Sequence, residues 1–237
     1  MPKKQTEKEK KKVKTKKTEK KVKSDKKDIT EIVCIVDRSG SMEAIKDDAI
    51  GGFNNFLKEQ QKEPGEAIMT IILFDDKYEV PCSGKPIAEV KPFNRTTFEP
   101  RGSTALLDAT GRAINEVNQR NPKKAILVIL TDGHENSSRE FTKQQIKQMI
   151  ADCEGKGWAV IYLSADANAF ADGRSFGVGV NNIMPFTSDA RGANVSTMAA
   201  SYATSDYRSM GRLGHGMSVY SARASTAYDS KPHKNYH

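Results

Sequence analysis

Carboxylate and hydroxyl side chains recur at three separated points of this sequence. They are Asp37, Ser39 and Ser41 in Asp-Arg-Ser-Gly-Ser, Thr104 in Gly-Ser-Thr, and Asp132 in Thr-Asp-Gly. No His or Cys stands among these oxygen donors, which suits a hard divalent cation such as Mg²⁺, Mn²⁺ or Ca²⁺ and disfavours zinc or copper. The residue types therefore predict a binding site for one hard cation.

Two of the three groups lie next to segments that are typical of buried strands. Residues 29–36 (ITEIVCIV) are rich in β-branched side chains and end at Asp37, and residues 125–130 (AILVIL) are apolar on both faces and come just before Asp132. Continuous apolar runs are typical of parallel sheets covered by helices on both sides. Because parallel sheets form their ligand crevices at the carboxyl ends of the strands, we expect these side chains to meet at one edge.

The remaining segments alternate between strand and helix patterns. Apolar runs predict further strands, and apolar residues at helical spacing predict the helices between them. The predicted strands are 67–74, 78–81, 158–163 and 182–186, and the predicted helices are 43–61, 104–118, 140–156 and 190–203. This alternation predicts an α/β fold with a doubly wound, mostly parallel central sheet flanked by helices.

The charge is divided unevenly along the chain. Residues 1–28 carry a net charge of +9 and residues 206–237 one of +3, so the total of +8 leaves −4 for residues 29–205. Residues 1–28 are too polar to form a core and are predicted to be a disordered Lys-rich arm. Residues 29–205 are predicted to form the folded domain. Residues 206–237 show no hydrophobic period and are predicted to be a flexible C-terminal tail.

The three groups of oxygen donors together resemble the metal-ion-dependent adhesion site of von Willebrand factor type A domains. The resemblance covers about residues 29–187 and rests on Asp37-x-Ser39-x-Ser41, Thr104 and Asp132. It implies a Rossmann-like fold in which the three hydroxyls bind the cation, foremost Mg²⁺, while the two aspartates bind it directly or through water. It also implies a free-standing bacterial or phage-type module that binds a protein partner presenting an acidic side chain.

The same residues favour recognition over catalysis. Only two carboxylates face the cation, so the site is expected to keep residual positive charge and an open position. The three segments contain no candidate general base or nucleophile, and we therefore expect no enzyme activity. A Mg²⁺-dependent hydrolase with Asp37 as nucleophile is less favoured, because Ser39 and Ser41 fit ion ligation better than phosphate transfer. Asp37 and Thr104 are expected on the rim of the domain rather than in its core.

Two further interpretations stay open. Asp-x-Ser-x-Ser taken alone also fits a turn whose hydroxyls cap a helix. Clustered Lys residues in 1–28 can bind nucleic acid through phosphate contacts, which would make the folded domain a scaffold for a nucleic-acid-associated protein. The arm can equally serve only to keep the chain soluble.

Cysteine usage and hydropathy bear on location. Cys34, Cys82 and Cys153 are odd in number and lack a C-x-x-C spacing, which argues against a disulfide framework and a structural zinc site. The N-terminal residues have no apolar leader segment, and no stretch approaches about eighteen consecutive apolar residues. We expect a cytoplasmic protein without membrane contact. Its oligomeric state and the identity of its partner are left open by the sequence.

Two other pairs of polar residues invite a functional interpretation. His134 and Glu135 follow Asp132 and are expected to be solvated surface residues of a loop. Asp75 and Asp76 lie between two predicted strands and are expected to bond the backbone of their own turn. None of these four residues is assigned to the cation site.

Overall fold

A single sheet organises the protein in the computed structural model, which describes residues 29–230. The sheet has six strands in the order β3-β2-β1-β4-β5-β6, and β3 pairs antiparallel with β2 whereas the other pairs are parallel. The strands are β1 (Thr30–Asp37), β2 (Ala67–Phe74), β3 (Tyr78–Pro86), β4 (Lys124–Thr131), β5 (Ala159–Ser164) and β6 (Ile183–Pro185). The predicted α/β fold class is thereby confirmed. The predictions for residues 1–28 and 231–237 lie outside the described residues.

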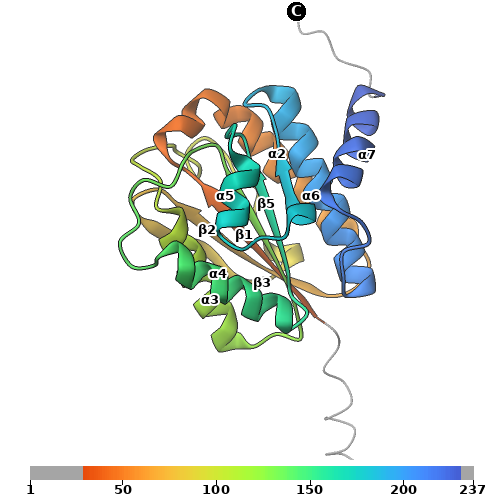
Figure 1. Cartoon of the computed structure of the whole chain (residues 1–237). Coiled ribbons are helices and arrows are strands. Elements are labelled where there is room, and N and C mark those ends of the chain that lie inside the picture. Colours follow the sequence, from red (N-terminus) through yellow and green to blue (C-terminus); the bar gives the residue numbers. More distant parts are fainter. Residues whose placement is uncertain (1–28, 231–237) are drawn as a thin grey trace, which may run out of the picture.

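Helices cover both faces of the sheet (Figure 1). One face packs against α3 (Leu106–Arg120) and α4 (Lys143–Gly155), and the other against α2 (Lys46–Lys62), α6 (Ala190–Met210) and α7 (Met217–Asp229). The short α5 (Ala169–Ser175) packs at the β6 edge. All residues of β1 are buried, as a strand covered on both faces requires.

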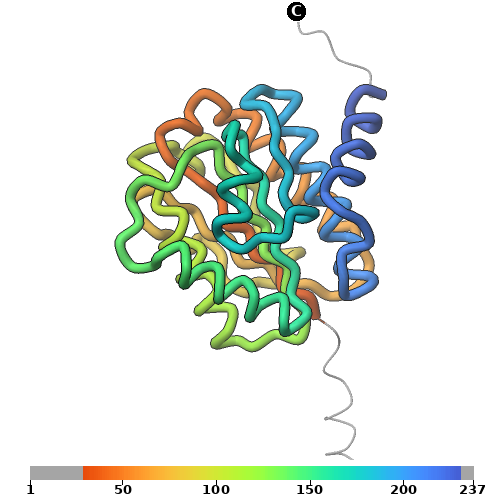
Figure 2. Tube along the Cα trace, viewed as in Figure 1, coloured from red at the N-terminus to blue at the C-terminus, as the bar shows by residue number. Residues whose placement is uncertain are grey.

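The strand β1 sets the position of the polar residues predicted to bind a cation. In the trace of Figure 2, β1 enters the sheet at its lower end and leaves it at the upper end, where the 3₁₀ turn η1 (Gly40–Ile45) leads into α2. Its neighbour β4 runs parallel, with Val36 opposite Leu130. The carboxyl ends of the two central strands therefore lie side by side.

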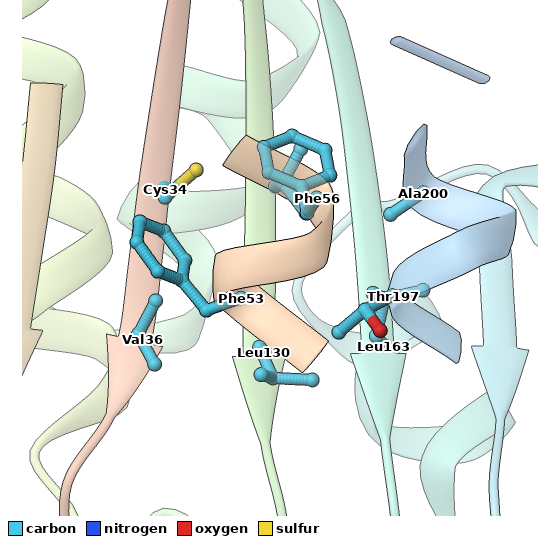
Figure 3. Close-up of a pocket in the computed structure, with 9 residues that line it drawn as sticks. Cys34, Val36, Phe53, Phe56, Leu130, Leu163, Thr197 and Ala200 are labelled. Atoms are coloured by element: carbon cyan, nitrogen blue, oxygen red, sulfur yellow. The ribbon is translucent and has the colours of Figure 1, made fainter. Parts of the chain in front are cut away.

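The contact between α2 and α6 is close at one point and loose at another. A Cβ added to Gly52 of α2 would lie 2.8 Å from Thr197 Oγ1 of α6, so only glycine fits there. Nearby, an apolar cavity of about 30 Å³ lies between these helices and the sheet. Figure 3 shows Phe53 and Phe56 of α2 facing it across from Val36 and Leu130. A cavity lined by such side chains stays dry.

Residues 206–229 do not form the flexible tail that the sequence predicted. Helix α6 continues to Met210, and α7 packs beside α6 with Met217, Tyr220 and Ala224 buried. The hydroxyl of Tyr220 donates to Asp206 at 2.6 Å. The prediction was wrong because α7 buries only a narrow stripe among small and polar residues, so the stripe is faint in the sequence. No helix within the described residues is long and apolar enough to cross a membrane.

Candidate metal site

The five predicted residues come together at the carboxyl ends of β1 and β4. Asp37 is the last residue of β1, Ser39 and Ser41 lie in the turn that follows, Thr104 precedes α3, and Asp132 directly follows β4. Ser39 Oγ and Ser41 Oγ are 3.1 Å apart, and the Ser41 hydroxyl donates to Asp132 Oδ1 at 2.7 Å. The sequence prediction that these side chains converge agrees with this geometry.

Gly133 borders the three hydroxyls of Ser39, Ser41 and Thr104. A Cβ built on it would be 3.3 Å from Thr104 Oγ1, 3.4 Å from Ser41 Oγ and 3.9 Å from Ser39 Oγ. The missing side chain leaves a small cradle faced by three neutral oxygen atoms. Hydroxyl and carboxylate oxygens are the donors that Mg²⁺, Mn²⁺ and Ca²⁺ accept, so the residues present fit a hard cation.

The carboxylate of Asp37 is held by its neighbours on both oxygen atoms. The backbone N–H of Ser39 donates to Oδ1 at 2.7 Å, and the hydroxyl of Thr131 donates to Oδ2 at 2.5 Å. Thr131 was not among the predicted site residues, although it stands next to Asp132 in the sequence. The signal that could have found it is a hydroxyl residue at the end of an otherwise apolar central strand.

Burial disfavours the charged forms of both aspartates. It raises the pKa of Asp37 to about 6, against the lowering effect of the hydrogen bonds from Thr131 and Ser39. Burial also raises the pKa of Asp132, which the hydrogen bond from Ser41 lowers. A nearby cation acts in the opposite direction, because it favours the carboxylate form.

Asp37 and Thr104 lie deeper than the sequence suggested. Asp37 is 0% exposed and Thr104 is 3% exposed, so neither residue lies on an open rim. Asp37 ends a strand covered on both faces, and Thr104 is enclosed by the loop that follows β4. The Asn136 side chain accepts from the Thr104 N–H at 2.9 Å, and the Asn136 N–H donates to the Thr104 carbonyl oxygen at 3.0 Å.

Glu135 organises this loop instead of lying free in solvent as expected. Its carboxylate accepts from the N–H groups of Leu107 at 2.9 Å, Ser137 at 3.0 Å and Ser138 at 2.7 Å. The Glu135 carboxylate therefore accepts a hydrogen bond from the Leu107 N–H in the first turn of α3, where a negative charge is favourable. The loop after β4 and the start of α3 are fixed together by one side chain.

An ion-pair network with a buried core, Arg38 and Asp75, joins the other two loops of the site. Arg38 Nη2 and Arg101 Nε each lie 3.0 Å from Asp75 Oδ2, and both arginines also contact Glu79. The Arg101 N–H donates to the Arg38 carbonyl oxygen at 2.9 Å. Asp75 also accepts from the Lys77 N–H at 2.6 Å, which confirms its predicted role in the turn, whereas the ion pairs were not predicted. They hold the loop that carries the two serines against the loop that carries Thr104.

Comparisons with known proteins found structural neighbours only. No protein-family model matches the sequence, and no curated protein matches it. Proximal thread matrix protein 1 from the mussel byssus is 19% identical at a TM-score of 0.42, over 57% of this chain and 36% of that chain. Manganese-loaded TRAP protein of Plasmodium vivax is 13% identical at a TM-score of 0.44, over 58% of this chain and 57% of that chain. A von Willebrand factor type A protein from Catenulispora acidiphila is 13% identical at a TM-score of 0.48, over 78% of this chain and 42% of that chain.

The chain thus spans between about a third and three fifths of the length of these neighbours. Its fold is defined by its own strands and loops. The sheet has one antiparallel edge strand, and Asp-x-Ser-x-Ser, Thr104 and Asp132 meet at the carboxyl ends of its central strands. With this sheet order and this group of side chains, the chain has a von Willebrand factor type A-like fold.

Proposed function

We propose that this protein is a metal-dependent protein-binding domain, in which one divalent cation joins the domain to an acidic side chain of a partner. The observation that carries the proposal is the cradle at Gly133, where the hydroxyls of Ser39, Ser41 and Thr104 face the same small space. Two carboxylates, Asp37 and Asp132, complete the donor set. Mg²⁺ is the proposed cation, with Mn²⁺ and Ca²⁺ as alternatives of the same hard class.

The balance of charge supports binding of a partner carboxylate. Ser39, Ser41 and Thr104 offer neutral oxygens, and the two aspartates offer at most two negative charges. A bound dication would therefore supply a Lewis-acidic position that an Asp or Glu of a partner can occupy. The deep placement of Asp37 and Thr104 leaves Ser41 and Asp132 as the more accessible donors, at which a partner would approach.

A non-catalytic role is part of the proposal. Asp37 Oδ1 and Oδ2 both accept hydrogen bonds, and the side chain is buried, so its oxygens are committed to positioning rather than to attack on a phosphorus or carbonyl atom. A hydrolase would need a nucleophile with access to substrate. The cytoplasmic location expected from the sequence belongs to the same proposal and is tested by fractionation of cells that express the chain.

The proposal is tested by calorimetric titration of Mg²⁺ and Mn²⁺ into the full chain. We expect saturable binding that is at least tenfold weaker in Ser41→Ala, because Ser41 is exposed and its loss removes one donor with little effect on the fold. Ser103→Ala, which lies in the loop of Thr104, is the matched control and should bind like the unmodified chain. Equal affinity in Ser41→Ala and Ser103→Ala would contradict a site at this place.

The partner is tested by capture on immobilised protein in the presence of Mg²⁺ and release by a chelator. A specific partner should be retained by the unmodified chain and by Ser103→Ala, and lost from Ser41→Ala. Substitution of the partner's contacting Asp or Glu by its amide should abolish retention. A partner that is retained equally in the chelator would show that binding does not pass through the cation.

A further inference from the structure

A second group of metal-binding side chains lies outside the five residues described above. His134, Asp166 and Asp172 each offer one ligand atom, and these three atoms lie within 4.8 Å of one another. His134 follows Gly133 in the loop after β4, Asp166 follows β5, and Asp172 is in α5. Three segments that are separate in the sequence therefore converge on one point.

The three side chains already point toward one another. His134 Nε2 lies 2.6 Å from Asp166 Oδ2, and His134 Nδ1 lies 3.4 Å from Asp172 Oδ2. Asp166 Oδ1 accepts from the Asn168 N–H at 2.6 Å, which fixes the orientation of that carboxylate. The Asp166 side chain is only 9% exposed, whereas the His134 side chain is 60% exposed. The group thus has a fixed inner carboxylate and an accessible outer imidazole.

The charge balance at this point differs from that at Asp75 and Glu31, two shielded carboxylates with arginine partners. Asp75 is paired with the guanidinium groups of Arg38 and Arg101, and Glu31 with that of Arg120. Asp166 and Asp172 instead share one imidazole, which is charged only when it is protonated. Two carboxylates held close together repel each other unless a cation compensates them.

We propose that His134, Asp166 and Asp172 form a second divalent-cation site, specific for a borderline transition ion such as Zn²⁺. One imidazole nitrogen and two carboxylate oxygens are a donor set that Zn²⁺ accepts, with bonds of about 2.0–2.2 Å and an open fourth position. The first site offers only oxygen donors, so the two sites differ in the class of metal that they select. His134 is the most exposed of the three, and a small rotation of its side chain would bring one imidazole nitrogen into ligand distance.

A cation at this site would tie the loop after β4 to the segment between β5 and α5. The same loop carries Asp132 and Gly133, so the second cation would hold the outer wall of the first site. This inference does not depend on the protein-binding proposal, because the two donor sets share no residue. Loss of either site should leave binding at the other measurable.

The test is titration of the full chain with Zn²⁺, followed by calorimetry, and with Co²⁺, followed by its visible absorption. We expect one equivalent of Zn²⁺ whose affinity falls at least tenfold in His134→Gln and in Asp172→Asn. The unmodified chain should show a Co²⁺ absorption band typical of a site with a nitrogen ligand, and this band should be absent from His134→Gln. His215→Gln, which changes a histidine in the α6–α7 connection, is the matched control and should bind one equivalent of Zn²⁺ like the unmodified chain.

Two comparisons separate this site from the first. Ser39→Ala combined with Ser41→Ala should retain Zn²⁺ binding, whereas His134→Gln should retain Mg²⁺ binding. The melting temperature should rise with Zn²⁺ in the unmodified chain and in His215→Gln, and not in Asp172→Asn. Zn²⁺ affinity that is equal in the unmodified chain, His134→Gln and Asp172→Asn would overturn the proposal, as would the absence of saturable binding to the unmodified chain.

Discussion

The hydroxyl of Thr131 donates to Asp37 across two neighbouring parallel strands, with 2.5 Å between Oγ1 and Oδ2. Thr131 ends β4 and Asp37 ends β1, so the bond joins the two strand ends that bring the donor groups together. Thr131 Oγ1 also accepts from the Gly133 N–H at 3.2 Å. One side chain therefore orients both the buried carboxylate and the glycine that borders the three hydroxyls.

Replacing Thr131 by Val should weaken cation binding without unfolding the domain. The two side chains have nearly the same shape, but Val lacks the donor to Asp37, and a hydrogen bond to a charged group contributes about 1.5–3 kcal/mol. We expect Mg²⁺ affinity to fall by roughly tenfold or more in calorimetry. Thr131→Ser keeps the hydroxyl and should bind within about twofold of the unmodified chain. If both variants bind equally, the hydroxyl does not position Asp37.

A methyl group at Gly133 should block the proposed cation site. The Cβ of Gly133→Ala would lie 3.3 Å from Thr104 Oγ1 and 3.4 Å from Ser41 Oγ, inside the space that a cation needs. We expect Mg²⁺ affinity to fall by at least tenfold, with a change in melting temperature of only a few degrees. Gly51→Ala is the control, because a Cβ at Gly51 meets nothing within 4 Å. Unchanged binding in Gly133→Ala would place the cation elsewhere.

The buried carboxylate of Asp37 should make the metal-free protein less stable above pH 6. The folded pKa of about 6 lies above the ordinary value of 3.8, so the protonated form is favoured in the fold. The contribution of this group is fully present at low pH and is lost as the pH rises through about 6. Asp37→Asn should therefore gain stability relative to the unmodified chain as the pH rises from about 4 to 7.5, by about 3 kcal/mol in all and by roughly half of that between pH 5 and pH 7.5.

Urea unfolding in the presence of a chelator measures this difference, since other titrating groups are common to both proteins. Added Mg²⁺ should raise the stability of the unmodified chain at pH 7.5 and have little effect on Asp37→Asn. A difference between the two proteins that stays constant from pH 5 to pH 7.5 would show that Asp37 does not titrate in this range.

The sequence was sufficient for the sheet and for the convergence of the five candidate residues, because both depend on local patterns. The apolar runs at β1 and β4 can satisfy their backbone only in a covered sheet, and the polar residues at their ends must then meet. The contacts that hold the site are non-local and left no such pattern. Arg38 occupies a variable position of Asp-x-Ser-x-Ser, and its partner Asp75 is 37 residues away.

Helix α7 was not predicted from the sequence, for a different reason. Its buried residues are Met217, Tyr220 and Ala224, and the other positions of the helix are mostly Ser, Ala, Arg and Thr. A stripe of this width is hard to distinguish from a polar segment when only hydrophobic period is considered. The bonds of the Tyr220 hydroxyl to Asp206 and to the Gly214 N–H depend on the folded α6–α7 connection and have no sequence signature.

Removing the Arg38 side chain should destabilise the domain strongly. Arg38 and Asp75 have side-chain exposures of 5% and 0%, so Arg38→Met leaves a buried carboxylate with only Arg101 beside it. Breaking a buried pair typically costs about 3–5 kcal/mol, and the second arginine should limit the loss to about 2–4 kcal/mol. Urea unfolding of Arg38→Met and of Arg38→Met with Asp75→Asn measures this cost. The double variant should recover part of the loss.

Arg112→Met is the matched control for this experiment. Arg112 pairs with Glu140 at the surface, where both side chains are more than a third exposed. An exposed pair of this kind contributes at most about 1 kcal/mol. Equal losses in Arg38→Met and Arg112→Met would contradict a structural role for the buried network.

Truncation distinguishes the domain boundary seen in the structure from the one expected at residue 205. Ending the chain after residue 205 removes α7 and the end of α6, and with them the buried side chains of Met217 and Tyr220. Each such side chain contributes about 1.5–3 kcal/mol when buried, and small domains have only about 5–15 kcal/mol in total. We therefore expect the shorter chain to unfold at much lower urea concentration or to aggregate.

The control is a chain that ends after residue 230 and keeps the whole of α7. It should unfold at the same urea concentration as the full chain. The midpoint of the chain ending at 205 should be lower by at least 1 M, because a loss of several kcal/mol is divided by a slope of about 1–3 kcal/mol per molar urea. If the two truncated chains are equally stable, α7 is an appendage, and the folded domain ends where the sequence alone had suggested.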